Sequence, residues 1–215
     1  MKLYNYFRSS ASYRVRIALN LKGLDYEYVP VHLTRGGGEQ RAPEFRALNP
    51  LALVPVLADG PETLTQSLAI IEYLEETHPE PPLLPKAAAE RARVRALALS
   101  MACEVHPLNN LRVLGYLTSK LGANEAAKNE WYRHWVEQGL SAFEASLAQS
   151  PLTGRFCHGD TPGLADCCLI PQLFNARRFA CDLSGYKTVL AIEARCQELA
   201  AFRDAAPEQQ PDAEK

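Results

Sequence analysis

The segment from His78 to Pro85 constrains the fold of this chain most strongly, because four of its eight residues are proline. Proline lacks a backbone N–H group and cannot sit in a helix interior, so the segment predicts a semi-rigid connection between two domains. We therefore expect a first domain over residues 1–78, a linker over residues 79–86 and a second domain over residues 87–215.

Before this connection, extended runs alternate with helical patterns. A glycine-rich stretch at residues 34–38 predicts a mobile loop, and Gly23 is a plausible end of the first helix. In the second helix, Glu72, Glu75 and Glu76 are expected to face outward. The expected strands cover residues 3–6, 26–31, 54–57 and 62–65, and the expected helices residues 12–22 and 67–77. This order is typical of a small mixed α/β sheet domain.

After the connection, apolar residues recur every three or four positions, as in helices. One stripe runs from Val94 to Leu108, on a long helix that Pro107 is expected to bend. Further stripes lie within residues 136–147, 164–174 and 189–199. The second domain is therefore expected to be all-helical. The polar, proline-broken tail at residues 206–212 is expected to be frayed.

Charge and composition exclude several kinds of partner. The formal net charge of −2 gives no general attraction to nucleic acid or an anionic membrane. The N-terminus lacks the apolar stretch of a signal peptide, and no run approaches the ~18 apolar residues of a membrane span. We expect a cytoplasmic protein. None of the six cysteines forms a Cys-x-x-Cys pair, so buried, reduced thiols are expected and no metal site.

Three features of the first domain can carry chemistry. Arg8–Arg16 lies where a strand ends and a helix begins, and a serine hydroxyl at a helix N-terminus can stabilise a thiolate. Taken alone, such serines are more typical of helix caps. A cis Val54–Pro55 bond would expose the Val54 backbone to a peptide-like ligand, and the sequence is compatible with both the cis and the trans isomer. Gln66–Ser67 opens the next helix, where a hydroxyl and free N–H groups suit a carboxylate.

Several segments resemble the zeta class of glutathione transferases, the class of maleylacetoacetate and maleylpyruvate isomerases. They are Arg8–Leu19, Ala47–Pro50, Val54–Pro55, Gln66–Leu74, His106–Asn110, Gly159–Pro162 and Ala176–Phe179, in the order and spacing of the family. The likeness extends from about Met1 to Pro211. It implies a thioredoxin-like N-terminal α/β domain, an all-α C-terminal domain, glutathione as cofactor and a homodimer.

The resemblance also implies roles for single residues. Ser9 is similar to the catalytic serine that holds the glutathione thiolate, with Ser10 and Arg8 beside it. The other positions expected to bind glutathione are Gln40, Val54 through its main chain, Gln66, Ser67, His106 and Asn110. His106 is expected to be a polar wall rather than a general acid–base. The expected ligands of a dicarboxylate substrate are Arg8, Arg112 and Arg178, because guanidinium binds carboxylate bidentately and stays charged.

The chain departs from the family pattern at two positions. Ala11 stands where many members carry a cysteine, two residues after the catalytic serine. The isomerisation thiol belongs to glutathione, so activity is not expected to be lost. Gly163 stands where the family has Thr or Ser at the start of a capping box closed by Asp166, which predicts a modest loss of stability.

The resemblance implies a glutathione-dependent isomerase that converts maleylacetoacetate to fumarylacetoacetate in tyrosine and phenylalanine breakdown. A thiolate adds to the cis double bond, the bond rotates and the thiolate leaves. The alternatives are a maleylpyruvate isomerase, a general glutathione transferase or haloacid dehalogenase, and a non-catalytic binding module. A single arginine after Leu111 slightly favours the longer substrate. Retention of Ser9, Gln66 and Ser67 argues against a module without turnover.

Overall fold

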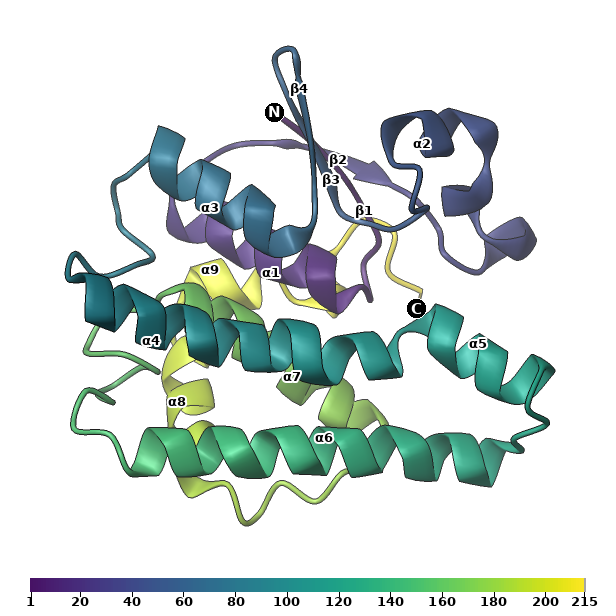
Figure 1. Ribbon diagram of the computed structural model, residues 1–215. Coiled ribbons are helices and arrows are strands. Elements are labelled where there is room, and N and C mark those ends of the chain that lie inside the picture. Colours follow the sequence, from purple (N-terminus) through teal and green to yellow (C-terminus); the bar gives the residue numbers. More distant parts are fainter. Residues whose placement is uncertain (215) are drawn as a thin grey trace. The chain divides into compact units, whose positions relative to one another are not determined.

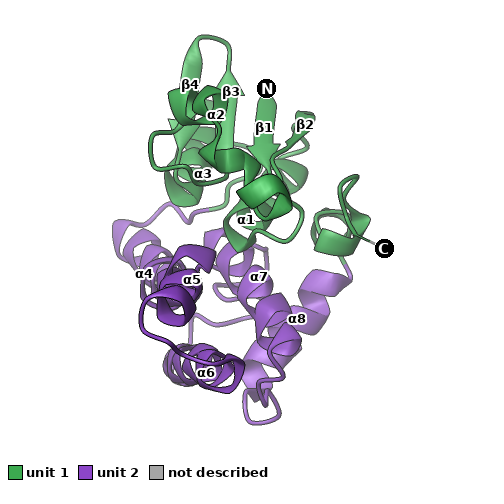
Figure 2. Ribbon diagram, turned by 90° about the vertical axis from the view of Figure 1, so that its right-hand side faces the viewer, with its two compact units in different colours: residues 1–83, 199–215 green, residues 84–198 purple. Residues whose placement is uncertain are grey.

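The computed structural model describes residues 1–214, and two compact units make up the chain (Figure 2). One unit consists of Met1–Leu83 together with Leu199–Lys215, and the other of Leu84–Glu198. The boundary after Leu83 lies inside the proline-rich connection. The C-terminal segment, however, belongs to the first unit, whereas the sequence pattern assigned it to the helical domain.

The first unit contains a mixed sheet, as predicted (Figure 1). Within residues 1–214 the sheet has four strands in the spatial order β2-β1-β3-β4. The pair β1–β2 is parallel, and β1–β3 and β3–β4 are antiparallel. The bounds are β1 Lys2–Asn5, β2 Glu27–Pro30, β3 Val56–Asp59 and β4 Glu62–Thr65. This arrangement confirms the thioredoxin-like prediction.

Helices α1 (Ser10–Leu21) and α3 (Ser67–Thr77) pack against each other in this unit. The α1 helix begins two residues earlier than predicted, because Ser9 caps it by accepting a hydrogen bond from the Ser12 N–H. Gly23 follows the helix with φ +64°, as a helix-ending glycine should. The glycine-rich stretch contains a 3-10 turn. The remaining elements here are η1 Arg35–Gly37, η2 Glu39–Arg41 and α2 Pro43–Leu48.

The prediction for Glu75 is wrong. Its side chain is buried rather than outward, and Oε2 accepts a hydrogen bond from the Lys22 ammonium at 2.8 Å and one from the Leu83 N–H at 2.9 Å. The Lys22 ammonium also donates to the carbonyls of His78 and Pro81. A buried carboxylate is tolerated only when it is paired and hydrogen-bonded in this way. The pair therefore ties the end of α1 to the proline-rich connection.

The second unit is helical, as predicted. Its elements are α4 Ala88–Leu99, η3 Ser100–Val105, η4 His106–Asn109, α5 Leu111–Ser119, α6 Glu125–Ala148, α7 Leu164–Arg178 and α8 Lys187–Gln197. The expected long helix to Leu108 is instead three segments: α4 passes into a π-helical turn, η3, and then the 3-10 turn η4. Pro107 lies in the first turn of η4, where a backbone N–H would have no helical partner, so the missing N–H of proline costs no hydrogen bond.

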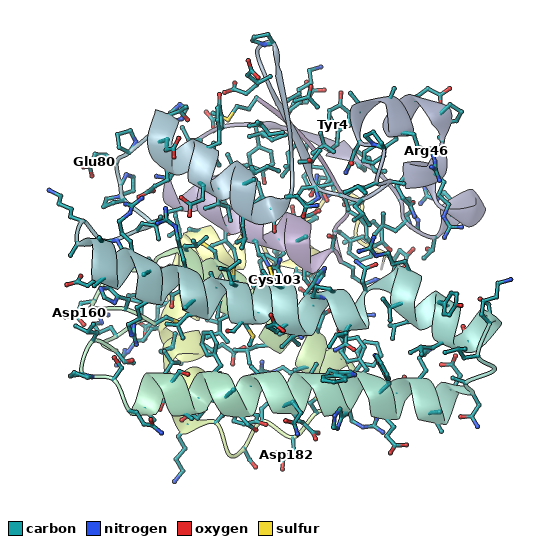
Figure 3. All side chains as sticks on the ribbon, in the orientation of Figure 1. Tyr4, Arg46, Glu80, Cys103, Asp160 and Asp182 are labelled. Carbon is teal, nitrogen blue, oxygen red and sulfur yellow. The ribbon has the colours of Figure 1, made fainter. Side chains whose placement is uncertain are left out.

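Buried thiols and a buried carboxylate lie around the start of α7. Asp166 accepts hydrogen bonds from the Gly163 and Cys157 N–H groups, at 2.8 and 2.9 Å, so the box closes without a side chain at its first position. Burial raises the pKa of the Cys157 and Cys167 thiols well above the ordinary value, which keeps them protonated and unreactive. Cys103, marked in Figure 3, is the exception to the prediction, because it is exposed.

The C-terminal segment is ordered against the first unit, so the prediction of a frayed tail is wrong. It contains α9 (Ala200–Arg203) and η5 (Pro207–Gln209). Pro207 is buried, and so is the Gln210 side chain, which donates to the carbonyls of Asp204 and Ala206, both at 2.8 Å. Buried polar groups with satisfied hydrogen bonds indicate a packed segment rather than a fraying end.

None of the helices within residues 1–214 is both long and apolar enough to cross a membrane. The same part of the chain holds no group of three or more His, Cys, Asp or Glu side chains placed to bind a metal ion.

Candidate functional site

The first part of the candidate site is the turn between β1 and α1, which carries Ser9. The Ser9 hydroxyl oxygen accepts the Ser12 N–H at 3.2 Å, and the Ser9 N–H donates to the Tyr6 carbonyl at 3.0 Å. A hydroxyl that accepts from the helix can still donate its own proton. Ser9 therefore combines an O–H donor with the positive end of α1, the two groups that lower a thiol pKa. Ser10, the first residue of α1, is buried.

A buried arginine is hydrogen-bonded to this turn. Arg16 is fully buried, and its guanidinium donates to the carbonyls of Tyr6 and Phe7 at 3.4 and 2.9 Å. It also donates to Asn5 Oδ1 and to the Ala205 carbonyl, both at 3.0 Å. One side chain thus connects the end of β1, the turn, helix α1 and the C-terminal segment.

Arg8 stands beside Ser9 with a partly exposed guanidinium. Its Nη2 donates to the Tyr6 hydroxyl at 3.1 Å, and its Cζ lies 5.1 Å from the centre of the Phe7 ring. The Glu214 carboxylate lies 3.6 Å from Nη1. The remaining exposed donors of Arg8 make it a suitable ligand for a carboxylate.

A second part of the site offers free peptide groups. The Val54–Pro55 bond is cis. Among the described residues, no partner within the chain takes up the Val54 N–H or C=O. Gln40 is buried, with Nε2 donating to the Leu33 carbonyl at 3.3 Å and Oε1 without a partner in this part of the chain. Buried polar atoms are almost always hydrogen-bonded, so these groups fit a peptide ligand.

The third part lies at the N-terminus of α3, where free N–H groups suit an anion. Gln66 is exposed and has φ +70°, and the buried Ser67 follows it as the first helical residue. The Ser67 hydroxyl oxygen accepts a hydrogen bond from Arg14 Nη1 at 3.2 Å, which leaves its own proton to donate to a ligand. The buried Arg14 guanidinium adds positive charge behind this carboxylate site.

These three parts fit glutathione, a tripeptide with a thiol and carboxylates. Ser9 suits the thiolate, Val54 and Gln40 suit the peptide backbone, and Gln66 and Ser67 suit a terminal carboxylate. The unpartnered Gln40 Oε1 and Val54 peptide groups carry this fit, because each needs an outside partner.

The other predicted residues lie in the second unit. His106 begins η4, Asn110 caps α5 by accepting the Arg112 N–H at 3.1 Å, and the Arg112 guanidinium is exposed. His106 and Asn110 therefore lie at the two ends of the η4 turn, and Arg112 lies in the first turn of α5.

Arg178 lies at the end of α7 with an exposed side chain, and its Nη1 is 3.3 Å from Asn175 Oδ1. The next ring, Phe179, stacks on Tyr132 of α6 at 3.5 Å between centroids. The Tyr132 carbonyl in turn accepts a hydrogen bond from Asn109 Nδ2 of η4 at 3.2 Å. Within the second unit, α6 therefore connects the end of α7 with the turn that carries His106 and Asn110.

Four residues near the site had no role in the sequence analysis: Arg14, Arg16, His32 and Glu214. The two arginines lie among core residues of α1, and charged residues on the buried positions of a helix predict polar partners in the interior. His32 and Glu214 carry no such signal, because their contact joins positions 182 residues apart.

Comparisons with known proteins agree with this geometry. Residues 3–82 match the family model "Glutathione S-transferase, N-terminal domain", and residues 125–205 match "Glutathione S-transferase, C-terminal domain". A probable maleylacetoacetate isomerase of Vibrio cholerae is 56% identical over 211 residues, which cover 98% of this chain and 97% of that protein.

Two solved structures are also similar over the whole chain. One is a holo structure of a maleylpyruvate isomerase, a bacterial zeta-class glutathione S-transferase, with 54% identity, a TM-score of 0.97 and 100% of both chains covered. The other is a maleylacetoacetate isomerase of Methylobacterium extorquens AM1 with bound malonate and glutathione, with 43% identity, a TM-score of 0.96 and 100% of both chains covered.

Proposed function

The chain belongs to the zeta class of the glutathione S-transferase family, and on this premise we propose that it is a glutathione-dependent cis–trans isomerase of maleylacetoacetate. The proposed product is fumarylacetoacetate. The observation that carries the proposal is the Ser9 hydroxyl, which caps α1 and keeps its proton available as a donor. We also expect a homodimer, as the family resemblance implies, and a cytoplasmic location.

Glutathione, when bound, would supply the thiolate that adds to the double bond and later leaves it. The chain's own residues determine what fraction of that sulfur is ionised at a given pH. The Ser9 O–H and the positive end of α1 both favour the charged form, and each unit by which they lower a thiol pKa is worth roughly 1.4 kcal/mol. Gln66 and Ser67 fix the cofactor by its carboxylate, and Val54 fixes its backbone.

Arg8, Arg112 and Arg178 are the proposed ligands of the substrate carboxylates. All three guanidinium groups are at least partly exposed. A guanidinium stays charged at every physiological pH and binds a carboxylate bidentately, so it can orient a dicarboxylate while the double bond rotates. His106 and Asn110 are proposed as polar contacts of the tripeptide.

Maleylpyruvate is the alternative substrate, because relatives with both names match this chain at nearly equal identity. The first experiment is a spectrophotometric isomerisation assay with maleylacetoacetate and maleylpyruvate side by side, with and without glutathione. We expect glutathione-dependent loss of the cis isomer, faster with maleylacetoacetate. A faster rate with maleylpyruvate would reassign the substrate, and no turnover of either by folded protein would overturn the isomerase proposal.

The Arg178→Ala variant is expected to raise the KM for the substrate about tenfold, because a charged hydrogen bond to a carboxylate is worth roughly 1.5–3 kcal/mol. The matched control is Arg177→Ala. Arg177 is the neighbouring residue, but its guanidinium pairs with the Glu193 carboxylate at 2.6 Å, so its loss should leave KM unchanged. Steady-state kinetics with each reactant varied separates the effects. A change confined to glutathione affinity would move Arg178 away from the substrate.

A further inference from the structure

The last residues of the described chain are anchored beside the turn that carries Ser9. Asp212 Oδ2 accepts a hydrogen bond from the Phe7 N–H at 3.2 Å, and Asp212 Oδ1 accepts one from the Tyr28 hydroxyl. Ala213 packs against the hydrophobic cluster that includes Tyr6 and Phe7. These contacts fix the position of the next residue, Glu214.

The Glu214 carboxylate is oriented by a histidine with a defined proton. His32 Nδ1 accepts the Arg35 N–H at 2.9 Å and lies 3.3 Å from the Thr34 N–H, so the ring proton of a neutral His32 is on Nε2. Nε2 lies 3.0 Å from Glu214 Oε1 and donates to it. The other oxygen, Oε2, faces Arg8 Nη1 at 3.6 Å.

Arg8 and Glu214 form an ion pair, but the distance between Nη1 and Oε2 is too long for a strong hydrogen bond. Both side chains are accessible to solvent, with 34% of the Arg8 side chain and 52% of the Glu214 side chain exposed. A ligand carboxylate could therefore approach Arg8 more closely than Glu214 does and form the short, bidentate contact that the present pair lacks.

Arg8 has supports other than Glu214. The Tyr6 hydroxyl accepts from Nη2, and the guanidinium lies over the Phe7 and Tyr6 rings at 5.1 and 5.8 Å. Removing the charge of Glu214 thus changes the electrostatic environment of Arg8 but leaves its main supports intact.

From this geometry we propose that Glu214 is an internal counter-ion of Arg8 that a substrate carboxylate displaces. The inference rests on the proposed function only in taking the ligand of Arg8 to be a dicarboxylate. Glu214 then acts as a specificity-determining residue: its negative charge lowers the affinity of every anion for Arg8, so a ligand binds well only if it offers a bidentate carboxylate. The cost is in substrate affinity and not in the chemical step.

The test compares wild type with Glu214→Gln, which keeps the shape and the hydrogen bond from His32 but removes the charge. The matched control is Glu208→Gln, at an exposed glutamate of the same C-terminal segment. Calorimetric titration with succinate, an unreactive dicarboxylate, should show roughly two- to fivefold tighter binding to Glu214→Gln at low salt. The difference should shrink as salt is added, because the pair is exposed.

In turnover, Glu214→Gln should lower the substrate KM by the same factor with kcat and glutathione affinity unchanged. Unchanged or weaker succinate binding, a matching gain in Glu208→Gln, or an effect on glutathione affinity alone would each overturn the proposal. The succinate titration needs no turnover, so it reports on Glu214 even if the wild type isomerises neither substrate, which is the outcome that defeats the proposed function.

Discussion

Replacing Ser9 by alanine is expected to lower glutathione-dependent turnover by well over tenfold. The variant loses the O–H donor for the thiolate, and deleting one such preorganised donor typically costs about 10²–10³ in kcat. It also loses the helix cap that accepts the Ser12 N–H, at about 1 kcal/mol of stability, which a folded domain tolerates.

The matched control for Ser9→Ala is Ser12→Ala. Ser12 is buried on the same helix, and within the described chain its hydroxyl has no hydrogen-bond partner, so its loss should leave turnover near normal. Ultraviolet absorbance of bound glutathione, titrated with pH, should show a higher thiol pKa in Ser9→Ala than in Ser12→Ala. A near-normal rate in Ser9→Ala would remove Ser9 from its proposed role.

Arg16→Met is expected to destabilise the protein by about 3 kcal/mol. The change orphans buried acceptors on Asn5, Phe7 and Ala205, and an unsatisfied buried acceptor costs roughly 1–3 kcal/mol. The variant no longer has the desolvation cost of a buried guanidinium charge, and this offsets part of the lost stability. The Tyr6 carbonyl stays satisfied, because it also accepts the Ser9 N–H.

Urea unfolding followed by circular dichroism, analysed at constant m, measures the effect of Arg16→Met. Arg16→Lys should be intermediate, since one ammonium keeps the charge but reaches fewer acceptors. The control is Arg35→Met at an exposed position, where a change within about 0.5 kcal/mol is expected. A similarly small change in Arg16→Met would show that the four contacts contribute little net stability.

Local patterns predicted most of the architecture. The division between the two units falls after Leu83, within the proline-rich segment, and the apolar spacing of Val136, Leu140 and Phe143 gave the buried face of α6. Such features depend on neighbours in the sequence, where chain chemistry and periodicity suffice. The same holds for Ser9, Ser67 and Val54, whose environments are set by a helix start or a proline.

Two of the errors, at Glu75 and at the C-terminal tail, came from long-range contacts. Glu75 resembled a solvent-facing helix residue, since nothing nearby shows that Lys22 reaches it from another helix. The polar tail resembled a frayed end because its partners, Phe7 and Tyr28, lie at the opposite end of the chain. Tertiary hydrogen bonds override local propensity in both cases, and a single sequence carries no record of them.

The first unit is assembled from both ends of the polypeptide, and this has a consequence for its synthesis. The ribosome synthesises residues 1–83 and then the whole of the second unit before it reaches Ala205 and Asp212. The Ala205 carbonyl accepts a hydrogen bond from Arg16, and the Asp212 carboxylate accepts one from the Phe7 N–H. The usual N-to-C order of domain completion is therefore reversed. A nascent chain that still lacks Ala205 and Asp212 carries Ser9 on an unfinished turn, so the catalytic half is completed only after residue 212 has been made.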